Sequence, residues 1–183
     1  MNKEQIEKIE KKLQEIFDER SAYVLTTAKA GLKGYMVRLE CYGLPFSIIA
    51  HLRDREEAER LIVLEFEKRA EESLKSIAYP LKDFDEYEEE ITLGEKDLES
   101  IYKYSDLDNS FDKDMKEEVK RETMAFIRKT ESLEYECVIT GKYKNLRAKG
   151  VSIRLDEAIK IAVWSATRII KPEPVFVGNP TYK

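Results

Sequence analysis

The sequence has few of the residues that mark specialised architectures. Its 183 residues include two cysteines, one histidine, one tryptophan, seven glycines and five prolines. Two cysteines cannot supply a disulfide framework, and so few glycines and prolines exclude a collagen-like or low-complexity chain. Cys41 and Cys137 each lie in an apolar run typical of a strand. We therefore expect both to be buried free thiols.

Signatures of catalysis and of cofactor binding are missing as well. A single histidine cannot build a histidine-based metal site, and neither cysteine has another Cys or His at ligand spacing. Gly31 and Gly34 fall in an expected hairpin turn and lack the Lys-Ser/Thr ending of a phosphate-binding loop. We predict no cofactor and no metal site. His51 is a weak candidate for a general base, and we expect it to be structural.

Long hydrophobic runs are also absent. No stretch approaches the ~18 consecutive apolar residues of a membrane span. The N-terminal MNKEQIEKIEKK is charged and helical in pattern, unlike a signal peptide. These observations predict no membrane partner and a cytoplasmic location.

Charge, by contrast, is abundant and unevenly distributed. Charged residues make up 38% of the chain, and the net charge is −5. Residues 142–183 carry nine Lys and Arg against three Asp and Glu, whereas residues 1–141 carry 23 against 34. This asymmetry favours an anionic partner for the basic part, and self-association or a cationic partner for the acidic part.

The spacing of apolar residues predicts an α+β fold, in which amphipathic helices pack on antiparallel hairpins and small sheets. Ala158, Ala162 and Ala166 are four residues apart, so the helix that carries them can lie close against a sheet. The expected helices span residues 3–19, 54–77, 112–129 and 155–170. The expected strands span residues 22–30, 35–43, 45–52, 133–141, 146–153 and 175–177.

The domain organisation follows from the same pattern. We expect an N-terminal α/β lobe at 1–80, an acidic connection containing aromatic residues at 81–111, and a C-terminal α/β lobe with an extended tail at 112–183. The lobes could also pack as one body. Each half runs helix, strands, helix, and the Glu-Cys pair at 40–41 echoes the pair at 136–137. We therefore consider two similar α-β-β-(β)-α lobes.

The order of helix, hairpin and helix in residues 112–170 resembles the double-stranded-RNA-binding domain. The sequence GVS at 150–152 precedes the last helix much as that family's glycine and serine do. That family opens its last helix with lysines, whereas this chain has RLDE at 154–157, and its third strand would require splitting residues 146–153. The resemblance implies a shared architecture, without membership of the family.

The basic hairpin is the main candidate site. Lys142 and Lys144 are expected on its first strand and Arg147 and Lys149 on its second, so each pair shares one face. With Arg154 they form the predicted nucleic-acid-binding residues, because neutralising phosphates releases counterions. The alternative is a solvated hairpin tip. Further cations of the last helix (Lys160, Arg168, Lys171) would enlarge the positive region only if that helix turned them to the same side.

A second candidate site is the acidic sequence DFDEYEEE. Its carboxylates could imitate a phosphate backbone and bind the basic groove of a protein partner, or they could belong to a solvated connection. The predicted protein-binding residues are Asp83, Asp85, Glu86, Glu88, Glu89 and Glu90.

These patterns favour a non-catalytic binding or inhibitory protein that engages nucleic acid, with RNA favoured, or a nucleic-acid enzyme complex. One example would be a mobile-element or phage-type inhibitor of a CRISPR-type nuclease. The first alternative is a metal-independent RNA-cleaving enzyme that uses the same cations, with His51 or a carboxylate as base. The second is a structural homo-oligomer whose acidic and basic surfaces pair.

Overall fold

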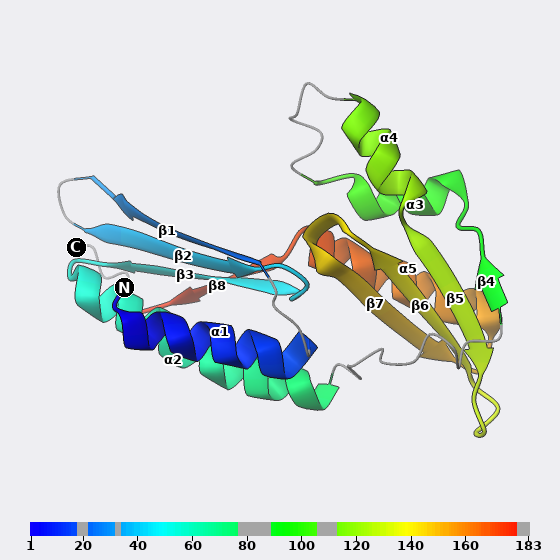
Figure 1. Ribbon diagram of the computed structural model, residues 1–183, viewed down its shortest axis with the longest axis horizontal. Coiled ribbons are helices and arrows are strands. Elements are labelled where there is room, and N and C mark those ends of the chain that lie inside the picture. Colours follow the sequence, from blue (N-terminus) through cyan, green and yellow to red (C-terminus); the bar gives the residue numbers. More distant parts are fainter. Residues whose placement is uncertain (18–21, 32–33, 77–88, 106–112, 179–183) are drawn as a thin grey trace. The chain divides into compact units, whose positions relative to one another are not determined.

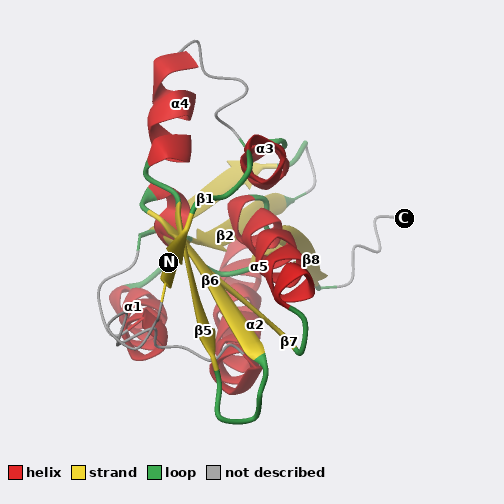
Figure 2. Ribbon diagram, turned by 90° about the vertical axis from the view of Figure 1, so that its right-hand side faces the viewer, coloured by secondary structure: helices red, strands yellow, loops and turns green. Residues whose placement is uncertain are grey.

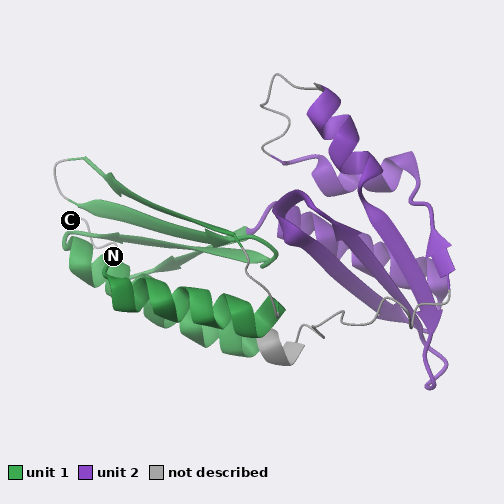
Figure 3. Cartoon of the chain, in the orientation of Figure 1, with its two compact units in different colours: residues 1–80, 173–183 green, residues 81–172 purple. Residues whose placement is uncertain are grey.

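The computed structural model describes residues 1–17, 22–31, 34–76, 89–105 and 113–178. The chain forms two compact units (Figure 3). Unit 1 consists of Met1–Pro80 together with Glu173–Lys183, and unit 2 is Leu81–Pro172. The sequence-based division placed the C-terminal tail with the preceding lobe, whereas the tail strand belongs to the sheet of unit 1.

Unit 1 is a four-stranded sheet with two helices. Its strands follow the order β1-β2-β3-β8, in which the first three are antiparallel and β8 runs parallel to β3 (Figure 1). Its elements are α1 (Lys3–Phe17), β1 (Tyr23–Lys29), β2 (Tyr35–Cys41), β3 (Phe46–Leu52), α2 (Arg55–Ser76) and β8 (Glu173–Val177).

Alternation along the strands builds the core of unit 1. Val37, Leu39 and Cys41 of β2 point to one face of the sheet, where they meet the apolar sides of α1 and α2. Ile9 and Leu13 of α1 are at most 1% exposed, as expected for an amphipathic helix lying on a sheet.

Unit 2 is a second four-stranded sheet, with the order β4-β5-β6-β7 and antiparallel pairing throughout. Helix α5 packs against β6 and β7 on one face of the sheet (Figure 2). Lys120 of α4 binds Glu95 at 3.3 Å and also Glu99, which holds α4 against α3. The elements are β4 (Glu89–Ile91), α3 (Glu95–Tyr102), α4 (Lys113–Arg121), β5 (Met124–Lys129), β6 (Tyr135–Gly141), β7 (Leu146–Ser152) and α5 (Leu155–Ile170).

The predicted helix over residues 112–129 is right for its first half and wrong for its second, because α4 spans Lys113–Arg121 and β5 begins at Met124. The spacing of the apolar residues in this stretch fits both the helical period and the alternation of a strand. Within β5, Ala125 and Ile127 are buried on alternate positions, and the whole strand pairs with β6. Tertiary pairing therefore overrides the helical spacing. The sequence predicted only two strands between the helices of this part of the chain. The structure has three, because β5 follows α4, and residues 146–152 remain a single strand.

The predicted α+β class is confirmed. In the described part of the chain, each unit runs helix, three antiparallel strands, helix: α1-β1-β2-β3-α2 in unit 1 and α4-β5-β6-β7-α5 in unit 2. The Glu-Cys pairs at 40–41 and 136–137 both lie on the middle strand of these three.

Helix α5 lies unusually close to β7. A Cβ atom added to Gly150 would lie 2.1 Å from the backbone oxygen of Ala158 and 2.5 Å from the backbone nitrogen of Ala162. Both alanines are fully buried, and so is Ala166. The prediction that the alanines allow this helix to lie close to a sheet is therefore confirmed. Gly150 on β7 contributes to the short distance, because it has no Cβ atom.

Candidate nucleic-acid interface

The connection of the basic hairpin differs from its expected form. Residues Tyr143–Asn145 form a 3-10 turn, so Lys142 and Lys144 do not lie on a strand. The Lys144 side chain is buried, and its Nζ donates a hydrogen bond to the backbone oxygen of Ile170 at 3.1 Å. Ile170 is the last residue of α5, where backbone carbonyls lack helical partners. Lys144 thus binds the C-terminal end of α5.

The other hairpin cations are mostly close to acids of the same chain. Lys142 Nζ lies 3.6 Å from Glu122 Oε1, and Lys149 Nζ lies 3.0 Å from Glu136 Oε1. Arg147 is half-buried on the same face of β7 as Lys149. The structure therefore brings Arg147 and Lys149 together, but these acids offset part of the positive charge that a polyanion would meet.

Arg154 stands apart from the hairpin, just before α5. Its guanidinium Nη2 lies 3.1 Å from Asp156 Oδ2, and its Nη1 lies 3.9 Å from Glu157 Oε1. These two acids occupy the first turn of α5, where they also favour the positive end of the helix dipole. The predicted Arg154 contact with phosphate would have to compete with both.

A charge network on the sheet face opposite α5 explains where Lys149 points. The Glu136 side chain is only 4% exposed, and its two oxygens bind Arg128 Nε at 2.8 Å and Lys149 Nζ at 3.0 Å. These three side chains come from three adjacent strands. Sequence reasoning missed Arg128 and Glu136, because cross-strand neighbours depend on register.

The outward side of α5 carries exposed cations and an exposed tryptophan. We call Lys160, Ile161, Trp164, Arg168 and Lys171 the α5 outer face. These positions lie on the side of the helix away from its buried alanines. Trp164 is 60% exposed, and the Arg168 guanidinium carbon lies 4.9 Å from the centre of its ring. Lys160 and Lys171 are exposed on either side.

The sequence contained part of this signal. Lys160, Arg168 and Lys171 were expected to enlarge the positive region only if the helix turned them to the side of the hairpin cations. They point away from the sheet, whereas Arg147 and Lys149 lie on the sheet face opposite α5, so the two groups form separate surfaces. Trp164 was missed. Its position four residues after Lys160 and four before Arg168, on the helix side opposite the alanines, could have identified it.

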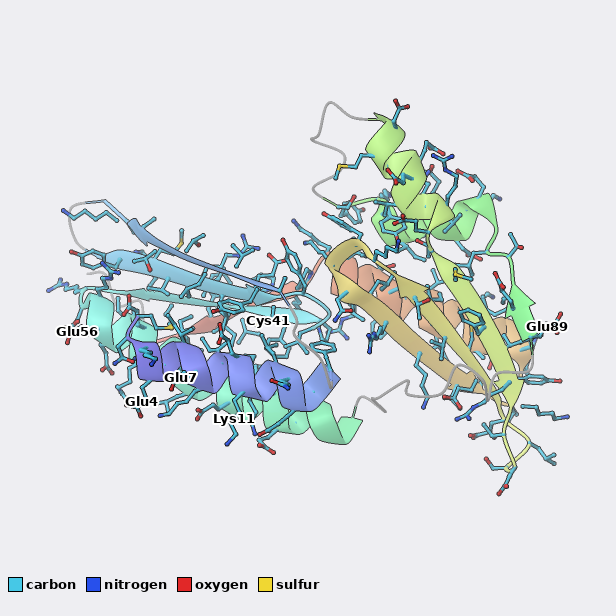
Figure 4. The ribbon with its side chains drawn as sticks, viewed as in Figure 1. Glu4, Glu7, Lys11, Cys41, Glu56 and Glu89 are labelled. Carbon is cyan, nitrogen blue, oxygen red and sulfur yellow. The ribbon has the colours of Figure 1, made fainter. Side chains whose placement is uncertain are left out.

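His51 does not combine with a cysteine. It lies on β3, while Cys41 lies on β2 and points to the helix-covered face (Figure 4). His51 alternates with Ala50, which faces that same core, so His51 points to the opposite face. A Cys–His pair for nucleophilic catalysis is therefore not formed in unit 1.

Both cysteines are buried thiols, as the sequence predicted. Burial raises the pKa of Cys41 far above its usual range and raises the pKa of Cys137 to about 12. A thiol with so high a pKa carries almost no reactive thiolate at neutral pH.

We accordingly expect neither Cys41 nor Cys137 to react with a thiol reagent in the native protein at pH 8. Both should react at once in concentrated urea, which provides the control for reagent and thiol content. Rapid labelling of one equivalent in the native state would show that one of these sites opens easily.

The acidic candidate site is only partly described. Asp83, Asp85, Glu86 and Glu88 lie outside the described residues. Glu89 and Glu90 are exposed on the edge strand β4, and Glu89 is labelled in Figure 4. Their exposure leaves these two carboxylates available to a cationic partner.

Surface hollows in unit 1 are lined largely by charged side chains. One lies between α1 and α2 and is lined mainly by lysines and glutamates. There Lys12 binds Glu15 at 3.2 Å and also Glu71, and the hydrogen bond to Glu71 is the main reason that the pKa of Lys12 is raised. Over the residues described, no three His, Cys, Asp or Glu side chains are placed to hold a metal ion. Nor does the described part include a helix long and apolar enough to cross a membrane.

Comparison with protein-family models and with curated proteins finds no match to this chain. Among the described surfaces, the α5 outer face combines an exposed aromatic ring with neighbouring cations.

Proposed function

We propose that this chain is a non-catalytic binding protein that engages single-stranded nucleic acid, with RNA favoured, or a complex that contains it. The observation that carries the proposal is the exposed Trp164 ring with the Arg168 guanidinium beside it on the α5 outer face. Of the hairpin cations, Lys144 binds the C-terminal end of α5, while Arg147 and Lys149 lie on the opposite face of the sheet and are not part of this surface.

The chemistry of the α5 outer face suits an unpaired base and its phosphates. An exposed aromatic ring gives a base a surface to stack on, and stacking of this kind tolerates any base. Lys160 precedes Trp164, and Lys171 follows it directly after the end of α5. The two lysines are eleven positions apart, which at the rise of an α-helix corresponds to roughly 16 Å. Their ammonium groups could therefore contact phosphates on both sides of a stacked nucleotide.

A single strand fits better than a duplex. Bases within a duplex are stacked on one another, so Trp164 could reach only a base that is splayed out. The double-stranded-RNA-binding domain, which the C-terminal part of the sequence resembles in architecture, opens its last helix with lysines. That position holds Asp156 and Glu157, both exposed, which would repel phosphates.

The binding could serve an inhibitory role. A protein that occupies a guide or substrate strand would block a nuclease complex without chemistry of its own. The exposed Glu89 and Glu90 of β4 would then be available to a basic groove of the same complex. An inhibitor of a CRISPR-type nuclease is one example of such a protein.

Trp164 provides its own test, because it is the only tryptophan in the chain. Titration with a single-stranded RNA oligomer at low salt should quench its fluorescence. We expect Trp164→Ala to weaken binding, measured by anisotropy of labelled RNA, by about tenfold or more, since one base stack is worth about 1–3 kcal/mol. The double variant Lys160→Glu/Lys171→Glu should also lower the dependence of affinity on salt by about two counterions.

Two control variants distinguish the surfaces. Lys142→Glu alters the hairpin, and Lys11→Glu alters an exposed lysine of unit 1. Both should bind nearly as well as the wild type. Absence of RNA binding at low salt would end the proposal. If Lys142→Glu abolishes RNA binding and Trp164→Ala does not, the binding site is the hairpin and not the α5 outer face.

A further inference from the structure

The two sheets end in four edge strands, and three of these carry features that discourage pairing with another strand. Strand β4 has three residues, two of them glutamates. Strand β7 carries Arg147 and Lys149 and lies under α5. Strand β8 contains Pro174. Charges, prolines, short length and a covering helix are the usual protections of sheet edges.

Strand β1 has the fewest of these protections. It has seven residues, YVLTTAK, with no proline, and its one charge is Lys29 at the end. Thr26, Thr27 and Ala28 are all exposed. Within the part of the chain that the structure describes, β1 pairs with β2 alone. A long, exposed edge with a single charge at its end is a template for a further strand.

The backbone of β1 shows which groups are available. The N–H of Ala30 donates to Gly34 O, and Ala22 O accepts from the N–H of Tyr42, each at 2.9 Å. Hydrogen-bonded pairs alternate along antiparallel strands, so the even-numbered residues of β1 face β2. The N–H and C=O groups of residues 23, 25, 27 and 29 consequently point to the free edge.

We propose that β1 pairs antiparallel with β1 of a second copy of this chain. With Thr26 opposite Thr26 of the second copy, Tyr23 faces Lys29 of the second copy and Leu25 faces Thr27 of the second copy. All four outward-facing residues of each strand are then hydrogen bonded. The unit 1 sheets of the two copies, with four strands each, then form one continuous sheet of eight strands.

The charge distribution makes this edge compatible with its own copy. The two Lys29 side chains lie at opposite ends of the paired strands, each beside a tyrosine ring. A comparable arrangement exists within unit 2, where Lys129 pairs across the strands with Tyr135 and its Nζ lies 5.5 Å from the ring centre. On the sheet face away from the helices, the partly exposed Val24 would meet Ala28 of the second copy. No like charges face each other.

Charge substitution at Thr26 tests the pairing directly. This position faces itself across the two-fold axis, so Thr26→Glu and Thr26→Lys each place like charges opposite one another. We expect sedimentation equilibrium to show a wild-type dimer, with each variant dissociating about tenfold or more easily. An equimolar mixture of the two variants should dimerise again, because Glu then faces Lys. Thr92→Glu and Thr92→Lys change another exposed threonine and should behave like the wild type.

Crosslinking tests the register. In a non-hydrogen-bonded pair, opposite Cα atoms lie about 4.5 Å apart, which suits a disulfide. Thr26→Cys should therefore form a covalent dimer on mild oxidation, whereas the neighbouring Thr27→Cys should not. The native Cys41 and Cys137 are buried and should not interfere.

Three outcomes would overturn the proposal. They are a wild-type protein that stays monomeric up to its solubility limit, a dimer unaffected by both Thr26 charges, and equal crosslinking at positions 26 and 27. Circular dichroism of each variant verifies that it is folded, and Thr26 is exposed, so its replacement should not disturb unit 1.

Discussion

Replacing Gly150 with alanine should destabilise unit 2 by about 3 kcal/mol or more. The added Cβ would meet backbone atoms of α5 at 2.1 and 2.5 Å. Backbone cannot rotate away as a flexible side chain can, so the whole helix must shift from β7. That shift would open the contact made by Ala158 and Ala162, which are fully buried. Valine at this position should prevent unit 2 from folding.

Urea unfolding followed by tryptophan fluorescence measures this effect in the correct unit. Trp164 is the only tryptophan and lies in unit 2, so its signal reports that unit. The midpoint should move to lower urea with an unchanged slope. Circular dichroism on the same samples should show that unit 1 retains its structure.

Gly94→Ala provides the matched control. A Cβ atom at Gly94 would have nothing within 4 Å. Because Gly94 is the N-cap of α3, a small loss below about 1 kcal/mol is expected. Equal effects of the two substitutions would show that α5 does not approach β7 as closely as described.

Replacing Glu136 with alanine should cost about 3 kcal/mol, a large part of the stability of a domain this size. The variant leaves Arg128 and Lys149 without the carboxylate that binds both. The cost is at the lower end for a broken buried pair, because both cations are somewhat more than one quarter exposed and can turn partly to water. The same urea titration measures it. Glu131→Ala, at an exposed position in a turn, should be nearly neutral.

A triple variant separates the cost of unpaired charges from the value of the network. Arg128→Met, Glu136→Leu and Lys149→Met together replace three charges by apolar side chains of similar size. We expect this variant to regain most of the stability lost in Glu136→Ala. If it is as unstable as the single variant, the network contributes favourable energy of its own and our explanation is wrong.

Most elements of the fold could be predicted, because the apolar residues of each follow one clear period. The helices near residues 3–19 and 54–77 and the strands between them appear where expected. The stretch 124–129 could not be assigned in this way. Its spacing satisfies both a helix and a strand, and the choice depends on pairing with β4 and β6, which lie elsewhere in the sequence.

The site was harder to predict, because charge along a sequence does not show which charges meet in space. Lys144 looks like any cation of the hairpin in sequence, yet a backbone φ of 52° turns it into the interior, where it binds Ile170. Lys149 binds a glutamate on the neighbouring strand. Exposure is equally invisible in sequence, and it is exposure that distinguishes Trp164 from a core aromatic residue.

The strand β8 imposes an order on the assembly of the molecule. Its partner strand β3 begins at Phe46, in the first third of the chain, whereas β8 begins at Glu173, after all of unit 2. During synthesis, unit 2 has every strand of its sheet before β8 leaves the ribosome. Most of unit 1 is translated first, but the outer edge of β3 stays without its partner strand until β8 has been made. The sheet of unit 1 is therefore completed after the sheet of unit 2.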